Sequence, residues 1–296
     1  MYIKFDRSRR STGVLYGTIG MLGFSGTLVA TRVAVTDFSP LTITCARIVI
    51  AAILSGFTLI ALRQYRLPQR KLMPSIFWMG LGLGVGFPFF VSLALVSVPA
   101  VHGAVAVGLA PAATAIIAAA RLQEHQDSRF WFACAVGFSG VFYYAWDAGG
   151  GQLLMADLWL LLALLCVGSA YVEGSRVAKV IGGTVALCWS MLSLAPFATI
   201  VLAYSNRNSD WSSVDTVSWV GIAYLGIISM FLASVFWYRG LAAGGVGRIG
   251  QLNLLVPLLA IGWSAILLGE RITATAIVCA FVVALAMLVC LRSRVA

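Results

Sequence analysis

The stretch Leu267-Leu268-Gly269-Glu270-Arg271-Ile272-Thr273 places a Glu-Arg pair between two long apolar runs. Glu124, 146 residues earlier, closes another apolar run in the same way. The same offset pairs four further identical residues, namely Pro111 with Pro257, Leu109 with Leu255, Ala119 with Ala265 and Leu122 with Leu268. Glu and Pro carry most of the weight because both are rare in this chain. The matches predict that the chain consists of two copies of one unit.

Composition places most of the chain in lipid. Hydrophobic residues make up 61% of the 296 residues, charged residues make up 10%, and the mean hydropathy is +0.97; a soluble domain carries about 25% charged residues. Runs of about 20 apolar residues predict membrane-spanning helices, whereas a barrel would show short alternating segments. Ten such runs occur, at residues 12–34, 40–62, 74–96, 99–121, 128–146, 156–177, 182–204, 216–239, 246–268 and 272–292.

These runs predict an all-α membrane protein of ten transmembrane helices in one membrane domain. Residues 1–146 would form the first five-helix repeat and residues 147–296 the second. Because five is odd, the second repeat must enter the membrane from the opposite side, which makes the repeats inverted. Such 5+5 architectures are typical of secondary transporters that alternate access to a central site.

The distribution of positive charge predicts the orientation of the chain. Of the 20 Lys and Arg residues, 16 fall on the tails and even-numbered loops with their flanks, and only Arg32, Arg207 and Arg271 fall on the other side. Cytoplasmic loops are enriched in Lys and Arg, so both termini are predicted to be cytoplasmic. The net charge of +10 is then a feature of topology and does not indicate a nucleic-acid partner.

The segment from Leu255-Val256-Pro257 to Thr273 resembles the recurring signature of the drug/metabolite transporter superfamily, in its EamA-type ten-helix branch. Arg47 matches the arginine usual in the second helix of such proteins. The first half departs from the pattern, with Glu124-His125 in place of Glu-Arg. The resemblance implies a multi-pass exporter of small metabolites in the plasma membrane, which would be a bacterial inner membrane. Within the family, the aromatic amino acid exporter (YddG-like) branch is the expected relative.

Polar and aromatic side chains inside the spans are the candidates for substrate binding, since polar groups in lipid are costly. They are His102, Gln251 and Asn253, together with Phe24, Phe90, Tyr171, Trp237 and Trp263. His102 could contact substrate or titrate near neutral pH. Each polar candidate could equally satisfy an interhelical hydrogen bond, and each aromatic could face lipid or pack.

Two charged residues inside the spans have alternative interpretations. Glu173 could couple transport to protons, or it could form an ion pair with Arg176 at spacing i, i+3. Arg47 could extend toward the outer interface and pair with Asp37, or it could bind a substrate carboxylate. The Glu270-Arg271 pair itself is expected to be structural, marking the outer end of the ninth span and the turn that follows.

The prolines at repeat-equivalent positions, Pro111 and Pro257, are expected to kink the fourth and ninth spans. Interrupted helices at matching positions of two halves indicate a transport pathway. The alternative is that both prolines only shape packing. Glycines at positions 17, 20, 23 and 26 of the first span predict close helix packing.

No motif indicates an enzyme. The three lysines complete no phosphate-binding loop, and the Gly-x-Gly-x-x-Gly match at residues 245–250 has no preceding strand. We therefore expect no cofactor, no metal and no catalytic residues. The predicted function is export of aromatic and bulky apolar amino acids or related metabolites by alternating access, as a monomer or homodimer in the bilayer. Alternatives are export of cationic drugs or polyamines, a membrane scaffold, or an intramembrane enzyme; proton antiport and facilitated export both stay open.

Overall fold

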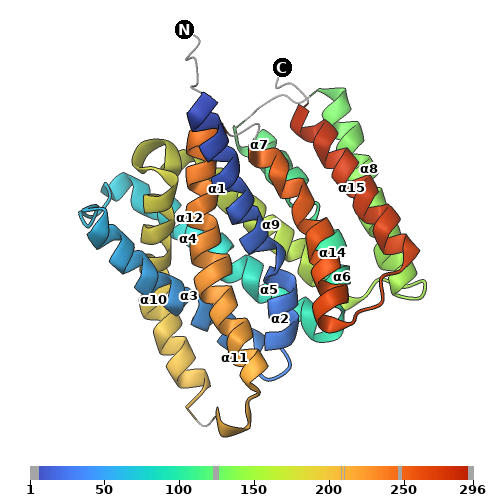
Figure 1. Ribbon diagram of the computed structural model, residues 1–296, viewed down its shortest axis with the longest axis horizontal. Coiled ribbons are helices and arrows are strands. Elements are labelled where there is room, and N and C mark those ends of the chain that lie inside the picture. The colour runs from blue at the N-terminus through green and yellow to red at the C-terminus, as the bar shows by residue number, and fades with distance from the viewer. Residues whose placement is uncertain (1–6, 123–126, 208, 210, 246–248, 293–296) are drawn as a thin grey trace.

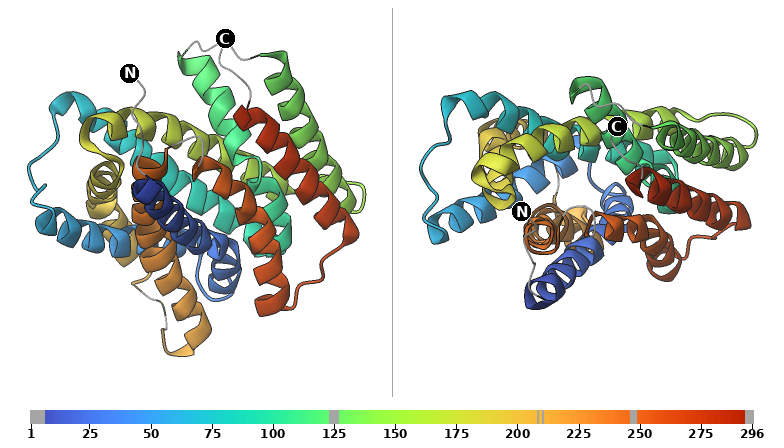
Figure 2. Two further views of the ribbon diagram at one scale, coloured as in Figure 1. Left: turned by 45° about the horizontal axis from the view of Figure 1, so that its top comes forward. Right: turned by 90° about the horizontal axis from the view of Figure 1, so that it is seen from above.

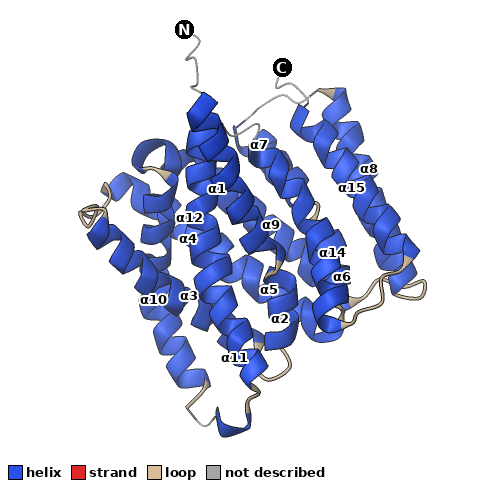
Figure 3. Ribbon diagram, viewed as in Figure 1, coloured by secondary structure: helices blue, strands red, loops and turns tan. Residues whose placement is uncertain are grey.

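The computed structural model describes residues 7–122, 127–207, 209, 211–245 and 249–292. Within these ranges all regular structure is helical (Figures 1 and 3). The longer helices are α1 (Arg7–Ser25), α2 (Thr27–Ala34), α3 (Pro40–Ala61), α4 (Met73–Gly80), α5 (Phe87–Ser97), α6 (Ala100–Val107), α7 (Ala110–Leu122), α8 (Ser128–Ala148), α9 (Met155–Ile181), α10 (Gly183–Ser205), α11 (Thr216–Ala223), α12 (Ala233–Gly244), α14 (Leu255–Leu268) and α15 (Ala274–Arg292). Shorter 3₁₀ or π segments are η1 (Arg70–Leu72), η2 (Leu81–Gly86), η3 (Trp211–Ser213), η4 (Tyr224–Leu232) and η5 (Gly250–Leu254).

The helices are long and apolar enough to cross a membrane many times. Among the described residues, eight helical stretches meet this description, from Ser11–Ala34 to Gly250–Leu268, and Ala274–Cys290 is a shorter apolar helix. The predicted fifth run is occupied by α8. The chain is therefore a multi-pass integral membrane protein.

Several of these stretches are interrupted near their middle. The first is divided at Gly26, between α1 and α2, and the fourth is divided at Gly108-Leu109, between α6 and α7. Two others contain a π-helical segment, η2 between α4 and α5 and η4 between α11 and α12. The stretch that ends in α14 begins with the 3₁₀ segment η5. Such irregular backbone in membrane helices often marks a functional site.

Pro111 and Pro257, the prolines expected to kink the fourth and ninth spans, each lie just after an irregular part of the helical stretch. Pro111 is the second residue of α7, and Pro257 is the third residue of α14. Proline is tolerated in the first turn of a helix, where its missing N–H has no intrahelical partner. The prolines thus begin the second half of each interrupted stretch.

Polar side chains define where several helices begin. The Ser39 hydroxyl accepts from the Thr42 N–H at 3.1 Å and caps α3, and Asp127 caps α8 by accepting from the Phe130 N–H at 2.9 Å. Asp157 reaches back to the Leu154 N–H at 2.8 Å at the start of α9. Each carboxylate or hydroxyl satisfies a backbone donor that the helix itself cannot pair.

The helices pack as pairs that join distant parts of the chain. The closest partners are α1 with α12, α3 with α10, and α8 with α15, which lie side by side in Figures 1 and 2. Glycine permits the α1–α12 contact: a Cβ added at Gly240 would lie 2.6 Å from the Gly17 backbone nitrogen, and one added at Gly20 would lie 2.8 Å from the Ala233 carbonyl. The first-span glycines therefore serve close helix packing, as predicted.

Glu270 has a structural partner that lies 170 residues away. Its two carboxylate oxygens accept hydrogen bonds from the Ala100 N–H at 2.8 Å and the Val101 N–H at 3.0 Å. These are the first backbone donors of α6, where a negative charge also interacts favourably with the helix dipole. The turn after α14 is made by Gly269 in the left-handed region, with φ +65°. Glu124, the repeat partner of Glu270, lies outside the described residues.

We predict that Gly240→Ala lowers the stability of the folded protein by about 1–3 kcal/mol, since the added methyl group must push α12 away from the α1 backbone. Thermal unfolding in detergent measures the loss. Gly56→Ala in α3 is the matched control because its added Cβ would meet nothing within 4 Å. Equal losses for the two variants would contradict the close contact.

We predict that Glu270→Ala costs about 1–3 kcal/mol of stability, because the backbone N–H groups of two buried residues, Ala100 and Val101, lose a charged acceptor. Glu270→Gln keeps one acceptor oxygen and should show a smaller loss. Arg271→Ala, at an exposed neighbouring side chain, is the control and should change stability by no more than about 0.5 kcal/mol. If Arg271→Ala lowered the unfolding temperature more than Glu270→Ala did, the role of Glu270 would be refuted.

Candidate functional site

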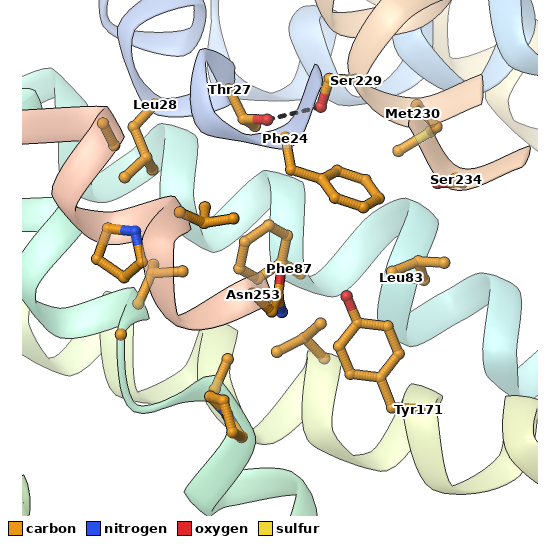
Figure 4. A pocket seen from close by; sticks show the side chains of 18 of the residues that line it. Phe24, Thr27, Leu28, Leu83, Phe87, Tyr171, Ser229, Met230, Ser234 and Asn253 are labelled. Atoms are coloured by element: carbon orange, nitrogen blue, oxygen red, sulfur yellow. Dashed lines mark hydrogen bonds between the residues drawn. The ribbon is translucent and has the colours of Figure 1, made fainter. Parts of the chain in front are cut away.

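A cavity of about 110 Å³ lies among the interrupted helices. It is lined by residues from both halves of the chain: Phe24, Thr27, Leu28, Arg47, Leu83, Phe87, Val107, Gly108, Ala110, Pro111, Val167, Tyr171, Ser229, Met230, Ser234, Asn253, Val256, Pro257 and Ala260. Figure 4 shows many of these side chains gathered around one space. The cavity is the candidate functional site.

The irregular segments of the helices meet at this cavity. Leu83 belongs to η2, Ser229 to η4 and Asn253 to η5, while Gly108 lies at the break between α6 and α7. Phe24 and Thr27 flank the break at Gly26. Non-helical backbone within a membrane is tolerated where it is buried in protein or lines a cavity.

The two prolines and the residues four positions before them line the site. A proline has no N–H to donate to the carbonyl four residues earlier. For Pro111 that carbonyl belongs to Val107, and for Pro257 it belongs to Asn253; both of these residues line the cavity. The matched prolines thus lie at one cavity, and their role in a transport pathway stays a prediction.

Arg47, from α3, is the cationic side chain among the described lining residues. Its exposed fraction is 3%, and its Nε and Nη1 atoms are buried with no hydrogen-bond partner among the described residues. A buried guanidinium is ordinarily paired with an anion or with acceptors. Here the lining offers it neither a carboxylate nor another anion.

The proposed pairing of Arg47 with Asp37 at the outer interface is wrong. Asp37 accepts instead from the Ser218 hydroxyl at 2.6 Å and from the Asp215 N–H at 3.3 Å, at the start of α11. Arg47 is buried beside the cavity, so its guanidinium does not extend to the interface.

Neutral polar groups surround the rest of the cavity. The Thr27 and Ser229 hydroxyls are hydrogen-bonded to each other at 2.7 Å and join α2 to η4. The Tyr171 hydroxyl points from α9 into the space near Phe24 and Asn253 (Figure 4). These groups can donate or accept hydrogen bonds without carrying charge.

Aromatic and aliphatic side chains form the apolar part of the lining. The Phe24 and Phe87 rings contribute to it, together with Leu83 and Met230 (Figure 4). Trp237 does not line the cavity; it packs edge-on against Phe24, with ring centroids 6.1 Å apart. An apolar wall with few convergent polar groups is the usual composition of a small-molecule site.

Four other predicted binding residues lie away from the cavity. His102 Nε2 lies 2.6 Å from Asp157 Oδ1, and its ring lies against Tyr144. Phe90 stacks on Trp159 with ring centroids 5.9 Å apart. The Trp263 Nε1–H donates to the Ser25 hydroxyl at 2.9 Å, and Gln251 is a half-buried residue of η5 outside the cavity lining.

Glu173 is held in an ion-pair cluster rather than in the cavity. The predicted pair with Arg176 is present at 3.4 Å, but the shorter contact is with Arg121 Nη1 at 2.7 Å. Arg121 also lies over the Trp78 ring at 5.9 Å from the ring centroid. The cluster joins the ends of α7 and α9, a contact between helices that spacing along one helix cannot indicate.

Sequence reasoning missed several cavity residues, among them Thr27, Phe87, Ser229 and Ser234. A hydroxyl within an apolar span is a weak signal, because Ser and Thr can pair with their own helix backbone. Phe87 is followed by Pro88 in the middle of a predicted span, and this Phe-Pro step could have singled it out.

Comparison with known proteins agrees with this architecture. The EamA-like transporter family model matches residues 11–146 and 154–292. A Bacillus subtilis (strain 168) protein named "Uncharacterized transporter YdeK" is 34% identical over 265 residues, which cover 90% of this chain and 92% of that protein. One crystal structure at 19% identity covers 95% of this chain and 98% of its own, with a TM-score of 0.64, and so shares the fold. The chain therefore belongs to the EamA-like transporter family of the drug/metabolite transporter superfamily.

Proposed function

We propose that this membrane transporter is a secondary exporter of small amphipathic metabolites, above all aromatic and bulky apolar amino acids. We propose that it works by alternating access. The observation that carries the proposal is the cavity at the meeting point of the helix interruptions. The direction, from the cytoplasm outward, rests on the resemblance to drug/metabolite exporters.

We further propose that ten spans form two inverted five-helix repeats, residues 1–146 and 147–296. The helix contacts support this proposal. When spans one to five are exchanged with spans six to ten, each of the main helix contacts becomes another contact that the structure also contains. Contact of the first span (α1) with the eighth (α12) becomes contact of the sixth (α9) with the third (η2 and α5), and α3–α10 and α8–α15 map onto themselves. The two matched ranges of the family model divide the chain at nearly the same place.

The arrangement of the chain ends supports cytoplasmic termini. The start of α1 and the end of α15 lie at one end of the bundle (Figure 1). With the excess of Lys and Arg on the tails and even-numbered loops, this end is proposed to face the cytoplasm. Inverted repeats placed in this way can exchange conformations and expose the cavity to either side in turn.

The chemistry of the lining supports an amphipathic substrate with no net positive charge. Phe24, Phe87 and Met230 offer an apolar surface, and the neutral hydroxyls and the Asn253 amide offer hydrogen bonds. The described lining contains Arg47 and no Asp or Glu, so a polyamine or cationic drug would meet repulsion without an opposing charge.

The same lining favours facilitated export over proton antiport. Proton-coupled transport ordinarily uses a carboxylate or histidine within the membrane, where it exchanges protons along the transport pathway. Glu173 and His102, the two candidates, are each paired outside the described lining. We therefore propose flux down the substrate gradient.

In proteoliposomes loaded with unlabelled phenylalanine, we predict counterflow of labelled phenylalanine, tryptophan and leucine, and no counterflow of labelled spermidine. The reason is the apolar cavity with a single cationic side chain. Protein-free liposomes set the background. Flux of spermidine without flux of any amino acid would overturn the proposed substrate class.

We predict that an imposed pH gradient produces no accumulation of labelled phenylalanine above its equilibrium level, because the described lining holds no carboxylate or histidine to carry the proton. The measurement is the uptake amplitude with and without the gradient at one substrate concentration. Gradient-driven accumulation that is lost in Glu173→Gln or in His102→Gln would establish proton antiport instead.

A further inference from the structure

We propose that Arg47 binds the carboxylate of the transported molecule. The substrates would then be organic anions with one negative charge, or zwitterions such as amino acids. The proposal deepens the transport function above and rests on it. Two observations carry it: Arg47 is a lining residue of the cavity, and its guanidinium is buried with Nε and Nη1 unpaired among the described residues.

Burial distinguishes Arg47 from three other arginines of the membrane-spanning stretches. Arg32 donates from Nη1 to the Leu95 carbonyl at 2.6 Å and to the Val96 carbonyl at 3.2 Å. Arg121 and Arg176 pair with Glu173 and have side chains exposed by 45% and 61%. Only Arg47 among these four combines 3% exposure with unpaired nitrogens, which is an unfavourable arrangement unless a ligand supplies the acceptor.

The donor geometry of Arg47 fits a planar anion. A guanidinium presents its N–H groups as a rigid fork that can bind both oxygens of one carboxylate. Phosphate has the same chemistry but carries nearly two negative charges. The described lining offers one cation and no second basic residue, which matches the single charge of a carboxylate better than that of a phosphate.

The remainder of the lining accommodates the rest of such a molecule. The Phe24 and Phe87 rings can contact an aromatic or aliphatic side chain. An amino group, where the substrate has one, can donate to the Tyr171 hydroxyl or the Asn253 side-chain oxygen, which belong to lining residues. The carboxylate is therefore the required group, whereas the amino group is optional.

The test measures ligand-dependent thermal stabilisation of the purified full-length protein in detergent. The probes share a phenyl group and differ in charge: phenylalanine, 3-phenylpropionate, phenethylamine, phenylalaninamide and phenyl phosphate. We expect phenylalanine and 3-phenylpropionate to raise the unfolding temperature, and phenethylamine, phenylalaninamide and phenyl phosphate to leave it unchanged. The ligand-free protein gives the reference for each variant.

Substitutions assign the effect to one side chain. Arg47→Gln is expected to weaken binding of both carboxylates by about tenfold to 100-fold, the usual effect of losing hydrogen bonds to a charged group. Arg47→Lys keeps the positive charge but not the forked pair of N–H donors, so its affinity for the carboxylates is expected to lie between those of the parent protein and Arg47→Gln. Because Arg47 has unpaired nitrogens, the ligand-free Arg47→Gln protein should unfold at the same temperature as the parent or higher.

Arg32→Gln is the matched control. It also removes a guanidinium from a membrane-spanning stretch, but that guanidinium holds backbone carbonyls of α5. We expect Arg32→Gln to lower the unfolding temperature of the ligand-free protein and to leave the preference for carboxylates unchanged.

Three results would overturn the proposal. The first is equal stabilisation of the parent protein by phenethylamine and by 3-phenylpropionate, and the second is no stabilisation of the parent protein by either carboxylate. The third is that the carboxylates stabilise Arg47→Gln as strongly as they stabilise the parent protein. A stronger effect of phenyl phosphate would replace carboxylate by phosphate as the anion. If any of these results were found while the proteoliposomes still showed counterflow of amino acids, the proposed transport function would stand and only the role of Arg47 would be removed.

Discussion

The structure depends on one constraint: a backbone N–H or C=O group in hydrocarbon must find its partner within the protein. Continuous α-helices meet this requirement with bonds between residues four apart, and the irregular segments meet it with other pairings. The Phe87 N–H at the end of η2 and the Ala233 N–H at the end of η4 each donate to the carbonyl five residues earlier, of Gly82 and Ile228. Residues of η2, η4, η5 and the break at Gly108 line one cavity, and the break at Gly26 is flanked by two more lining residues. The departures from regular α-helix and the candidate site thus lie at the same place.

The spans could be predicted from sequence because their signal is local. Twenty apolar residues require no knowledge of neighbours, and the observed helices lie where the apolar runs predict them. The interruptions could not be located in the same way. Whether Gly26 divides a helix, or Gly82 and Gly84 belong to a π segment, depends on what packs beside them, such as the Cys166 carbonyl that approaches Gly82.

For the site, sequence reasoning identified the residue types better than their partners. Phe24, Tyr171, Asn253, Arg47 and both prolines line the cavity, as residues that are rare or bulky within apolar spans. His102 and Trp263 are just as unusual in the sequence, yet Asp157 and Ser25 satisfy them elsewhere. A polar residue in a span reveals a need for a partner, and only the tertiary structure tells whether the protein itself provides it.

The contact between Glu270 and α6 gives one side chain influence over the balance of conformations. Its two hydrogen bonds tie the turn after α14 to the first residues of α6. Any conformation that separates these two segments must replace both bonds with water, and any that keeps them together must move them as one body. The free-energy difference between such conformations, and hence the fraction of time spent in each, includes the strength of this single carboxylate contact.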